Sequence, residues 1–219
     1  MGEQLAITSD DLRTELYTKR MAKPGSPGRH IYDALRQAAP NGICPLCAVG
    51  VVSTLDHVMP KAIFPALAVT PLNLVPACGD CNKTKTDRAP ATAREQFIHP
   101  YYDNLDGVTW LHAEPLFEDP VRIVFSVRTP PDTDPDLTAR LTHHFTALKL
   151  AERYAAHAAQ ELLSQAKLIR DLRTLPDPGQ LREHLDQQAD TRSAANPNSW
   201  QSAMYRALAD SDRFCSQAI

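Results

Sequence analysis

Cys44-Pro45-Leu46-Cys47 and Cys78-Gly79-Asp80-Cys81 are two cysteine pairs of identical spacing, and 30 residues separate them. Two residues between cysteines allow a tight turn to aim both sulfurs at one ion, and two such turns complete the four-thiolate shell that structural zinc prefers. We therefore expect one structural zinc ion, and four unmetallated thiols are the less favoured alternative. Because four cysteines leave no open coordination position, this zinc should stabilise the fold without activating water.

The segment between the two pairs contains the residues suited to catalysis. It includes Thr54-Leu55-Asp56-His57 and Asn73, and Asn82 directly follows the second pair. A carboxylate can hold a hard divalent ion such as Mg2+, and a neutral imidazole can take a proton from water near pH 7. The two asparagines can orient the histidine and supply a second oxygen to the ion. These groups together suit metal-assisted phosphodiester hydrolysis.

The ordered pattern Asp56-His57, Asn73 and Cys78-x-x-Cys81-Asn82-Lys83 resembles the HNH endonucleases, also called ββα-metal nucleases. The resemblance is to the branch with two zinc knuckles and asparagine at the third signature position. It implies that His57 is the general base and that Asp56 and Asn82 bind the catalytic ion. It also implies that Asn73 fixes the loop carrying His57, and that the knuckles clamp a β-hairpin and a following helix. Many relatives have histidine in place of Asn82, and the asparagine oxygen favours Mg2+ or Mn2+ at the catalytic site.

Four basic residues near the motif are candidates for contacts with DNA phosphates, and a solvated basic face is the alternative. They are Lys61, Lys83, Lys85 and Arg88. The segment from His99 to Asp103 could stack on a nucleic-acid strand, but packing of the nuclease core is the favoured interpretation.

Helical and strand patterns surround the motif, and the expected fold class is α+β. Helical spacing before residue 42 and after residue 135 predicts helices at both ends, and alternation over 121–127 predicts a strand, with a weaker one over 108–113. A proline-rich acidic stretch at 129–135 interrupts both patterns. We expect N-terminal helices (1–42), a zinc-stabilised HNH core with a short β segment (43–128) and a C-terminal helical region (129–219).

Composition limits how the protein can bind nucleic acid. The 219 residues have a formal net charge of −3, which excludes a polybasic surface. Residues 1–100 carry 11 basic and 9 acidic side chains, whereas residues 101–219 carry 12 and 17. The acidic second half therefore suits a protein partner better than DNA. No signal peptide or membrane span is visible, so we expect a cytoplasmic protein without membrane association.

The predicted function is metal-dependent endonucleolytic cleavage of DNA. A compact HNH protein with a helical tail is similar to nuclease subunits of bacterial anti-phage systems, which implies a regulatory ATPase or another defence subunit as a partner. The alternative is a non-catalytic zinc-knuckle module that binds nucleic acid or protein.

Overall fold

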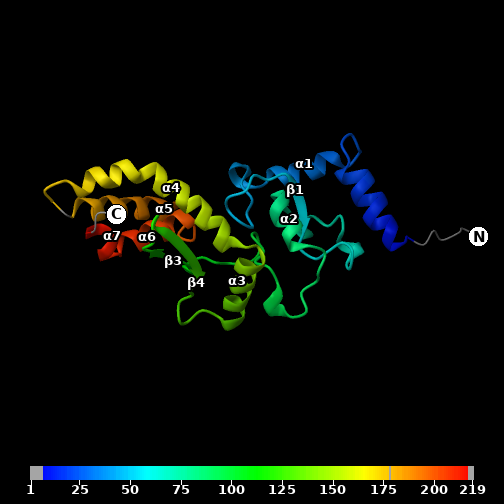
Figure 1. Cartoon of the computed structure of the whole chain (residues 1–219). Helices are drawn as coiled ribbons and strands as arrows, with labels where there is room; N and C mark the ends of the chain where they lie inside the picture. Colours follow the sequence, from blue (N-terminus) through cyan, green and yellow to red (C-terminus); the bar gives the residue numbers. More distant parts are fainter. Residues whose placement is uncertain (1–6, 178, 217–219) are drawn as a thin grey trace, which may run out of the picture. The chain divides into compact units, whose positions relative to one another are not determined.

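The computed structural model describes residues 7–177 and 179–216, and these residues form two compact units (Figure 1). The first unit ends at Asn104 and the second begins at Leu105. The mixture of helices and small antiparallel sheets confirms the α+β class. The division differs from the expected boundaries after residues 42 and 128, because both of these positions lie inside a unit.

The N-terminal helices belong to the first unit because they share its hydrophobic core. The chain forms a π-helix, η1 (Asp11–Ala22), and then α1 (Arg29–Gln37). Their buried side chains pack with those of the later β-hairpin in one cluster, which comprises Tyr17, Met21, Tyr32, Leu55, Ala68 and Leu74. The expected boundary after residue 42 would divide this cluster.

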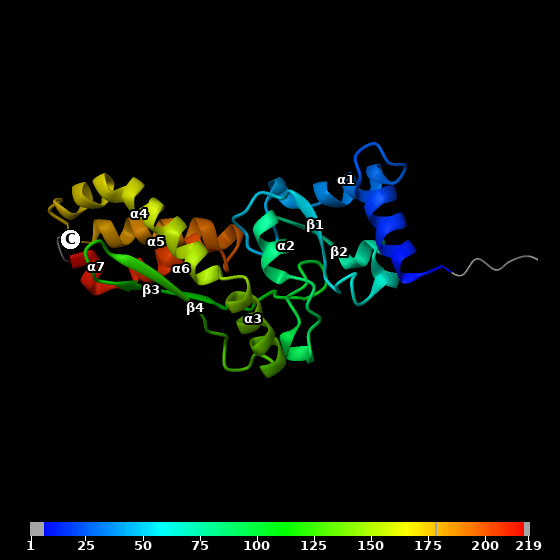
Figure 2. The ribbon, with the colours of Figure 1, turned by 45° about the vertical axis from the view of Figure 1, so that its right-hand side comes forward.

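A β-hairpin and a short helix form the centre of the first unit (Figure 2). Strand β1 (Thr54–His57) pairs antiparallel with β2 (Leu74–Ala77), and α2 (Gly79–Lys85) follows directly. This is the ββα order that the resemblance implies. Short 3-10 turns complete the unit: η2 (Pro40–Gly42), η3 (Pro65–Leu67), η4 (Pro71–Asn73) and η5 (Ala93–Glu95).

The second unit packs a β-hairpin against helices. Strand β3 (Leu111–Leu116) pairs antiparallel with β4 (Arg122–Val127). Helix α6 (Trp200–Ala209) packs on β3, and helix α4 (Leu150–Arg173) packs on β4. The expected boundary after residue 128 is therefore not where the chain divides. The helices are α3 (Pro135–Ala147), α4 (Leu150–Arg173), α5 (Gln180–Ala195), α6 (Trp200–Ala209) and α7 (Asp212–Ser216).

Strand β3 begins three residues later than the sequence pattern indicates. The side chain of Asn198 accepts a hydrogen bond from the Trp110 amide at 2.7 Å and donates one to the Val108 carbonyl at 2.8 Å. A distant side chain thus satisfies backbone groups that a strand would otherwise pair.

No helix among the described residues is long and apolar enough to cross a membrane.

Candidate active site

The four cysteines of the two pairs come together as a zinc site in the first unit. Their sulfurs lie within 4.8 Å of one another, and all four residues are buried. Sulfurs bound tetrahedrally to zinc at about 2.3 Å are separated by about 3.8 Å. The Sγ atoms of Cys47 and Cys78 are 3.8 Å apart, so this pair already has the spacing that the ion requires.

A tight backbone turn after Cys47 shapes the first knuckle. The Cys44 amide donates to the Gly50 carbonyl at 2.7 Å, and the Gly50 amide donates to the Cys47 sulfur at 3.3 Å. A Cβ atom at Gly50 would lie 2.7 Å from the sulfur of Cys78. Glycine is therefore required here because the backbone approaches the thiolate cluster closely.

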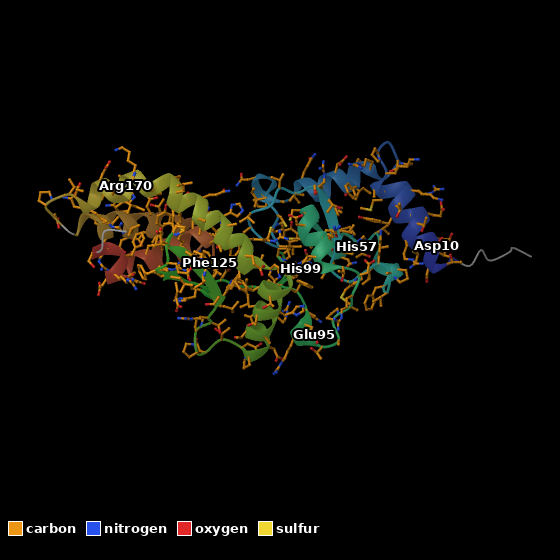
Figure 3. The ribbon with its side chains drawn as sticks, in the orientation of Figure 1. Asp10, His57, Glu95, His99, Phe125 and Arg170 are labelled. Atoms are coloured by element: carbon orange, nitrogen blue, oxygen red, sulfur yellow. The ribbon has the colours of Figure 1, made fainter. Side chains whose placement is uncertain are left out.

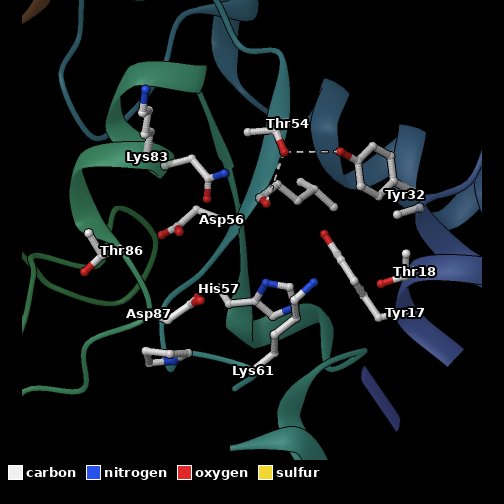
Figure 4. A pocket seen from close by; sticks show the side chains of 14 residues that line it. Tyr17, Thr18, Tyr32, Thr54, Asp56, His57, Lys61, Lys83, Thr86 and Asp87 are labelled. Carbon is white, nitrogen blue, oxygen red and sulfur yellow. Dashed lines mark hydrogen bonds between the residues drawn. The ribbon is translucent and has the colours of Figure 1, made fainter. Parts of the chain in front are cut away.

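Asp56 and His57 both line a cleft of about 520 Å³ in the first unit, as do Asn82 and Lys83 (Figure 4). Neighbours in a strand normally point to opposite faces. His57 is the last residue of β1, and the Val58 amide already bonds to the Asn73 carbonyl at 2.9 Å. The strand ends at the pair, and both side chains can therefore reach one cleft.

The His57 imidazole is held in one orientation by a backbone acceptor. Its Nε2 lies 2.9 Å from the Ala68 carbonyl oxygen, and its ring meets the Tyr17 ring edge-on at 4.5 Å. A carbonyl can only accept, so Nε2 carries the proton and the neutral ring has Nδ1 free to accept another. Burial lowers the pKa of His57 from 6.5 to about 4, although the bond to Ala68 opposes the shift. The histidine is therefore neutral and able to act as a base at pH 7.

The buried carboxylate of Asp56 forms an ion pair with Lys85. Their Oδ2 and Nζ atoms are 3.1 Å apart, but Oδ2 makes no hydrogen bond of good geometry among the described residues. Burial raises the pKa of Asp56 from 3.8 to about 6, and Lys85 opposes this rise. Asp56 is thus a buried carboxylate whose charge is balanced by one neighbouring ammonium group.

The donor set of the cleft fits a catalytic Mg2+ or Mn2+ ion. Asp56 lines the cleft as a carboxylate, and Asn82 lines the same cleft with an amide that bonds to no described residue. Hard oxygen donors of this kind suit Mg2+ and Mn2+ better than zinc. Asp56 and Asn82 are thus suitable ligands for the ion.

Asn73 lies at the position for which the resemblance implies a positioning role. Its Oδ1 accepts from the Met59 amide at 2.7 Å, and its Nδ2 donates to the carbonyls of Met59 and Leu67 at 3.0 and 3.1 Å. These bonds tie both ends of the β1–β2 connection to one buried side chain. The loop that follows His57 is fixed in this way.

The four candidate phosphate-binding residues lie in three different environments: the cleft, the exposed surface outside the cleft, and the protein interior. Lys83 and Lys61 line the cleft, and Lys61 places Nζ 4.4 Å above the Tyr17 ring. Arg88 is exposed but lies outside the cleft lining. Lys85 is only 6% exposed and donates to the His57 and Val58 carbonyls at 2.5 and 3.1 Å. The expectation that Lys85 contacts phosphate is therefore wrong, because its ammonium group is consumed inside the protein.

Sequence reasoning missed several residues of the cleft. Tyr17 and Tyr32 come from the N-terminal helices, whereas Asp87 follows α2. Asp87 comes directly after Thr86, which adopts φ +61° where α2 ends, an unusual conformation for a β-branched residue. Nothing in the local sequence signals these positions, since tertiary packing brings them to the motif.

The His99 segment packs within the first unit. Figure 3 labels His99, which belongs to this unit. Its Nε2 lies 3.2 Å from the Leu72 carbonyl oxygen, and its ring contacts Tyr102 with centroids 4.4 Å apart. The backbone amide of His99 donates to Asp103 at 2.6 Å. These contacts attach the segment to the turn before Asn73.

Comparison with known proteins agrees with this geometry. The HNH endonuclease family matches residues 44–88, which include both cysteine pairs, β1, β2 and α2. The chain belongs to the HNH endonuclease family.

The similarity to a relative extends well beyond the motif. The chain is 31% identical over 214 residues to protein ea31 of Escherichia phage lambda, and the alignment covers 91% of this chain and 72% of the relative. No solved structure matches the chain.

Proposed function

We propose that the protein is a divalent-metal-dependent endonuclease that hydrolyses DNA phosphodiester bonds. One observation supports this above all others: the bond between His57 Nε2 and the Ala68 carbonyl leaves Nδ1 unprotonated in the cleft that Asp56 and Asn82 line. A fixed base beside oxygen ligands is the arrangement that hydrolysis of a phosphodiester requires.

The chain's own residues have distinct parts in this proposal. His57 takes a proton from the attacking water at Nδ1, and Asn73 keeps its loop in place. Asp56 and Asn82 would hold a Mg2+ or Mn2+ ion. When bound, that ion would neutralise the scissile phosphate and stabilise the departing 3′ oxygen. The zinc cluster stabilises the hairpin and helix that carry these residues.

Positive side chains around the cleft would guide the DNA backbone. Lys61 and Lys83 would contact phosphates at the cleft, and Arg88 would contact the strand just beyond it. Burial lowers the pKa of Lys61, and Asp87 opposes this shift. Because few cations are available, binding should depend strongly on the catalytic ion.

A protein partner is a separate proposal that concerns the second unit. The acidic balance of residues 101–219 suits a protein surface better than DNA. A regulatory ATPase of a bacterial anti-phage system, with the nuclease acting in the cytoplasm, is the partner that the family resemblance suggests. The relative ea31 comes from a phage, so the comparisons do not favour a defence role over a role in phage biology. Co-purification of an ATPase with the full-length chain supports the partner, and an always monomeric, fully active protein contradicts it.

Cleavage of supercoiled plasmid tests the nuclease proposal. We expect nicked and linear products with Mg2+ or Mn2+, none with EDTA, and loss of activity in His57→Ala. His30→Ala, which changes an exposed histidine outside the cleft, should cleave as the wild type does. Equal cleavage by wild type and His57→Ala rejects His57 as the base. DNA binding without cleavage under every condition favours the zinc-knuckle binding module.

A further inference from the structure

One wall of the cleft comes from helices that lie outside the HNH match at residues 44–88. Tyr17, Thr18 and Ala22 of η1 and Tyr32 of α1 line this wall, opposite Asp56 and Lys83 (Figure 4). Residues from outside the nuclease motif are therefore positioned to reach a substrate bound at the candidate ion site.

Tyr17 is the most firmly held side chain of this wall. It is 6% exposed and packs with Met21 and Leu55 in the core. Its ring contacts His57 edge-on with centroids 4.5 Å apart, and the Lys61 ammonium lies 4.4 Å above its face. The ring thus has contacts on its edge and its face, and the hydroxyl has a fixed position.

The Tyr17 hydroxyl makes no hydrogen bond to any described residue and points into the cleft (Figure 4). The neighbouring Tyr32 hydroxyl differs, because it lies 3.4 Å from the Thr54 hydroxyl. A rigid donor that no described residue engages, beside a base and two candidate ion ligands, is available to a ligand.

The helix that carries Tyr17 has an unusual backbone that fits a functional role. The Thr18 hydroxyl donates to the Arg13 carbonyl at 3.0 Å, and the Lys23 amide donates to the Thr18 carbonyl at 3.1 Å. The second of these is a backbone bond that spans five residues, as expected in a π-helix. Segments of π-helix are rare and frequently occur at functional sites.

We propose that the Tyr17 hydroxyl donates a hydrogen bond to a non-bridging oxygen of the scissile phosphate, so that the N-terminal helices supply a catalytic residue. This inference rests on the proposed nuclease function. Negative charge grows on the phosphate as water attacks, and a preorganised donor stabilises that charge more than it stabilises the ground state. Its loss should therefore lower kcat with little effect on KM.

Steady-state plasmid cleavage by the full-length protein tests this role. Tyr17→Phe keeps the ring that packs on His57 and Lys61 and removes only the hydroxyl. We expect kcat to fall about 100-fold, the scale for loss of one transition-state donor, with zinc content, melting temperature and Mg2+ affinity unchanged. Tyr102→Phe, which removes the hydroxyl of an exposed tyrosine outside the cleft, should have wild-type kcat.

The outcomes separate this inference from the proposed function. A kcat for Tyr17→Phe within twofold of wild type, or a change confined to KM, overturns the role of Tyr17 while an inactive His57→Ala variant upholds the nuclease. Equal cleavage by wild type and His57→Ala rejects His57 as the base and, with it, the cleft as the place where Tyr17 acts.

Discussion

Asp56 and His57 are adjacent in the sequence, but burial moves their pKa values in opposite directions. The pKa of His57 falls to about 4 and that of Asp56 rises to about 6. Burial disfavours the charged form of each group, so the histidine stays neutral down to a lower pH and the carboxyl becomes protonated at a higher pH than usual. At neutral pH the pair thus consists of a ready base and an ion ligand that protonates on mild acidification.

The raised pKa of Asp56 predicts that ion binding weakens in mild acid. The ion must displace a proton from a carboxyl with a pKa of about 6, so the apparent Mg2+ affinity should fall about tenfold from pH 7 to pH 5. A carboxyl at its ordinary pKa near 3.8 would give almost no change over this range. Calorimetric titration of the zinc-loaded protein measures the affinity, with Asp56→Asn as the control that should not bind. A constant affinity from pH 7 to pH 5 contradicts the description of Asp56.

Lys83 and Lys85 are two positions apart, and the structure predicts different consequences of removing them. Lys85→Met leaves Asp56 without its buried partner and should cost about 3–5 kcal/mol in the free energy of unfolding. Lys83→Ala removes an exposed side chain and should change stability by less than about 0.5 kcal/mol. It should instead reduce the salt dependence of DNA binding by about one phosphate contact. Denaturant unfolding and salt titrations measure both effects, and equal stability of the two variants would refute the distinction.

At the scale of elements, the cysteine knuckles, the hairpin and α2 position the candidate site. The spacing of the cysteines predicts this unit because each knuckle is a local structure with a local sequence signal. The second wall of the cleft has no such signal. Tyr17 precedes the motif by 27 residues, and only packing of η1 against the hairpin brings it to His57. Lys85 could not be distinguished from Lys83 by sequence, because burial separates them.

Two glycines next to the cysteines allow a matched test of the knuckle geometry. In Gly50→Ala the new Cβ would lie 2.7 Å from the Cys78 sulfur, so the zinc cluster must shift and the first unit should lose about 1–3 kcal/mol. In Gly79→Ala the nearest atom is the Ser53 hydroxyl at 3.7 Å, and a helical alanine should add about 0.5–1 kcal/mol. Thermal unfolding and zinc-release assays compare the two. Similar behaviour of both variants would show that the close approach at Gly50 is unimportant.

At the scale of the whole molecule, the chain comprises two units with separate cores. The α+β class follows from periodicity, but the expected boundaries after residues 42 and 128 do not match the division at residue 104. The cores decide this division: the N-terminal helices pack on β1 and β2, and the β3–β4 hairpin packs on α4 and α6. Single-sequence patterns indicate elements but carry little information about which elements share a core.

The two-unit organisation predicts that zinc removal affects the chain unevenly. Zinc binding supplies folding free energy to the first unit alone, so a strong chelator should unfold that unit and leave the second folded. Both tryptophans, Trp110 and Trp200, lie in the second unit and are buried. Far-UV circular dichroism should thus lose part of its signal while tryptophan emission stays blue-shifted. A red shift that follows the loss of helicity would contradict independent stability of the second unit.

Chemical rescue of a histidine variant tests the central claim, that His57 is the general base of a nuclease, most directly. His57→Gly removes the imidazole from a cleft of about 520 Å³, which has room for free imidazole. In the presence of Mg2+ the variant should be inactive alone, and its plasmid cleavage rate should rise with added imidazole in proportion to the neutral form. Cleavage by His57→Gly at the wild-type rate without imidazole would contradict the account.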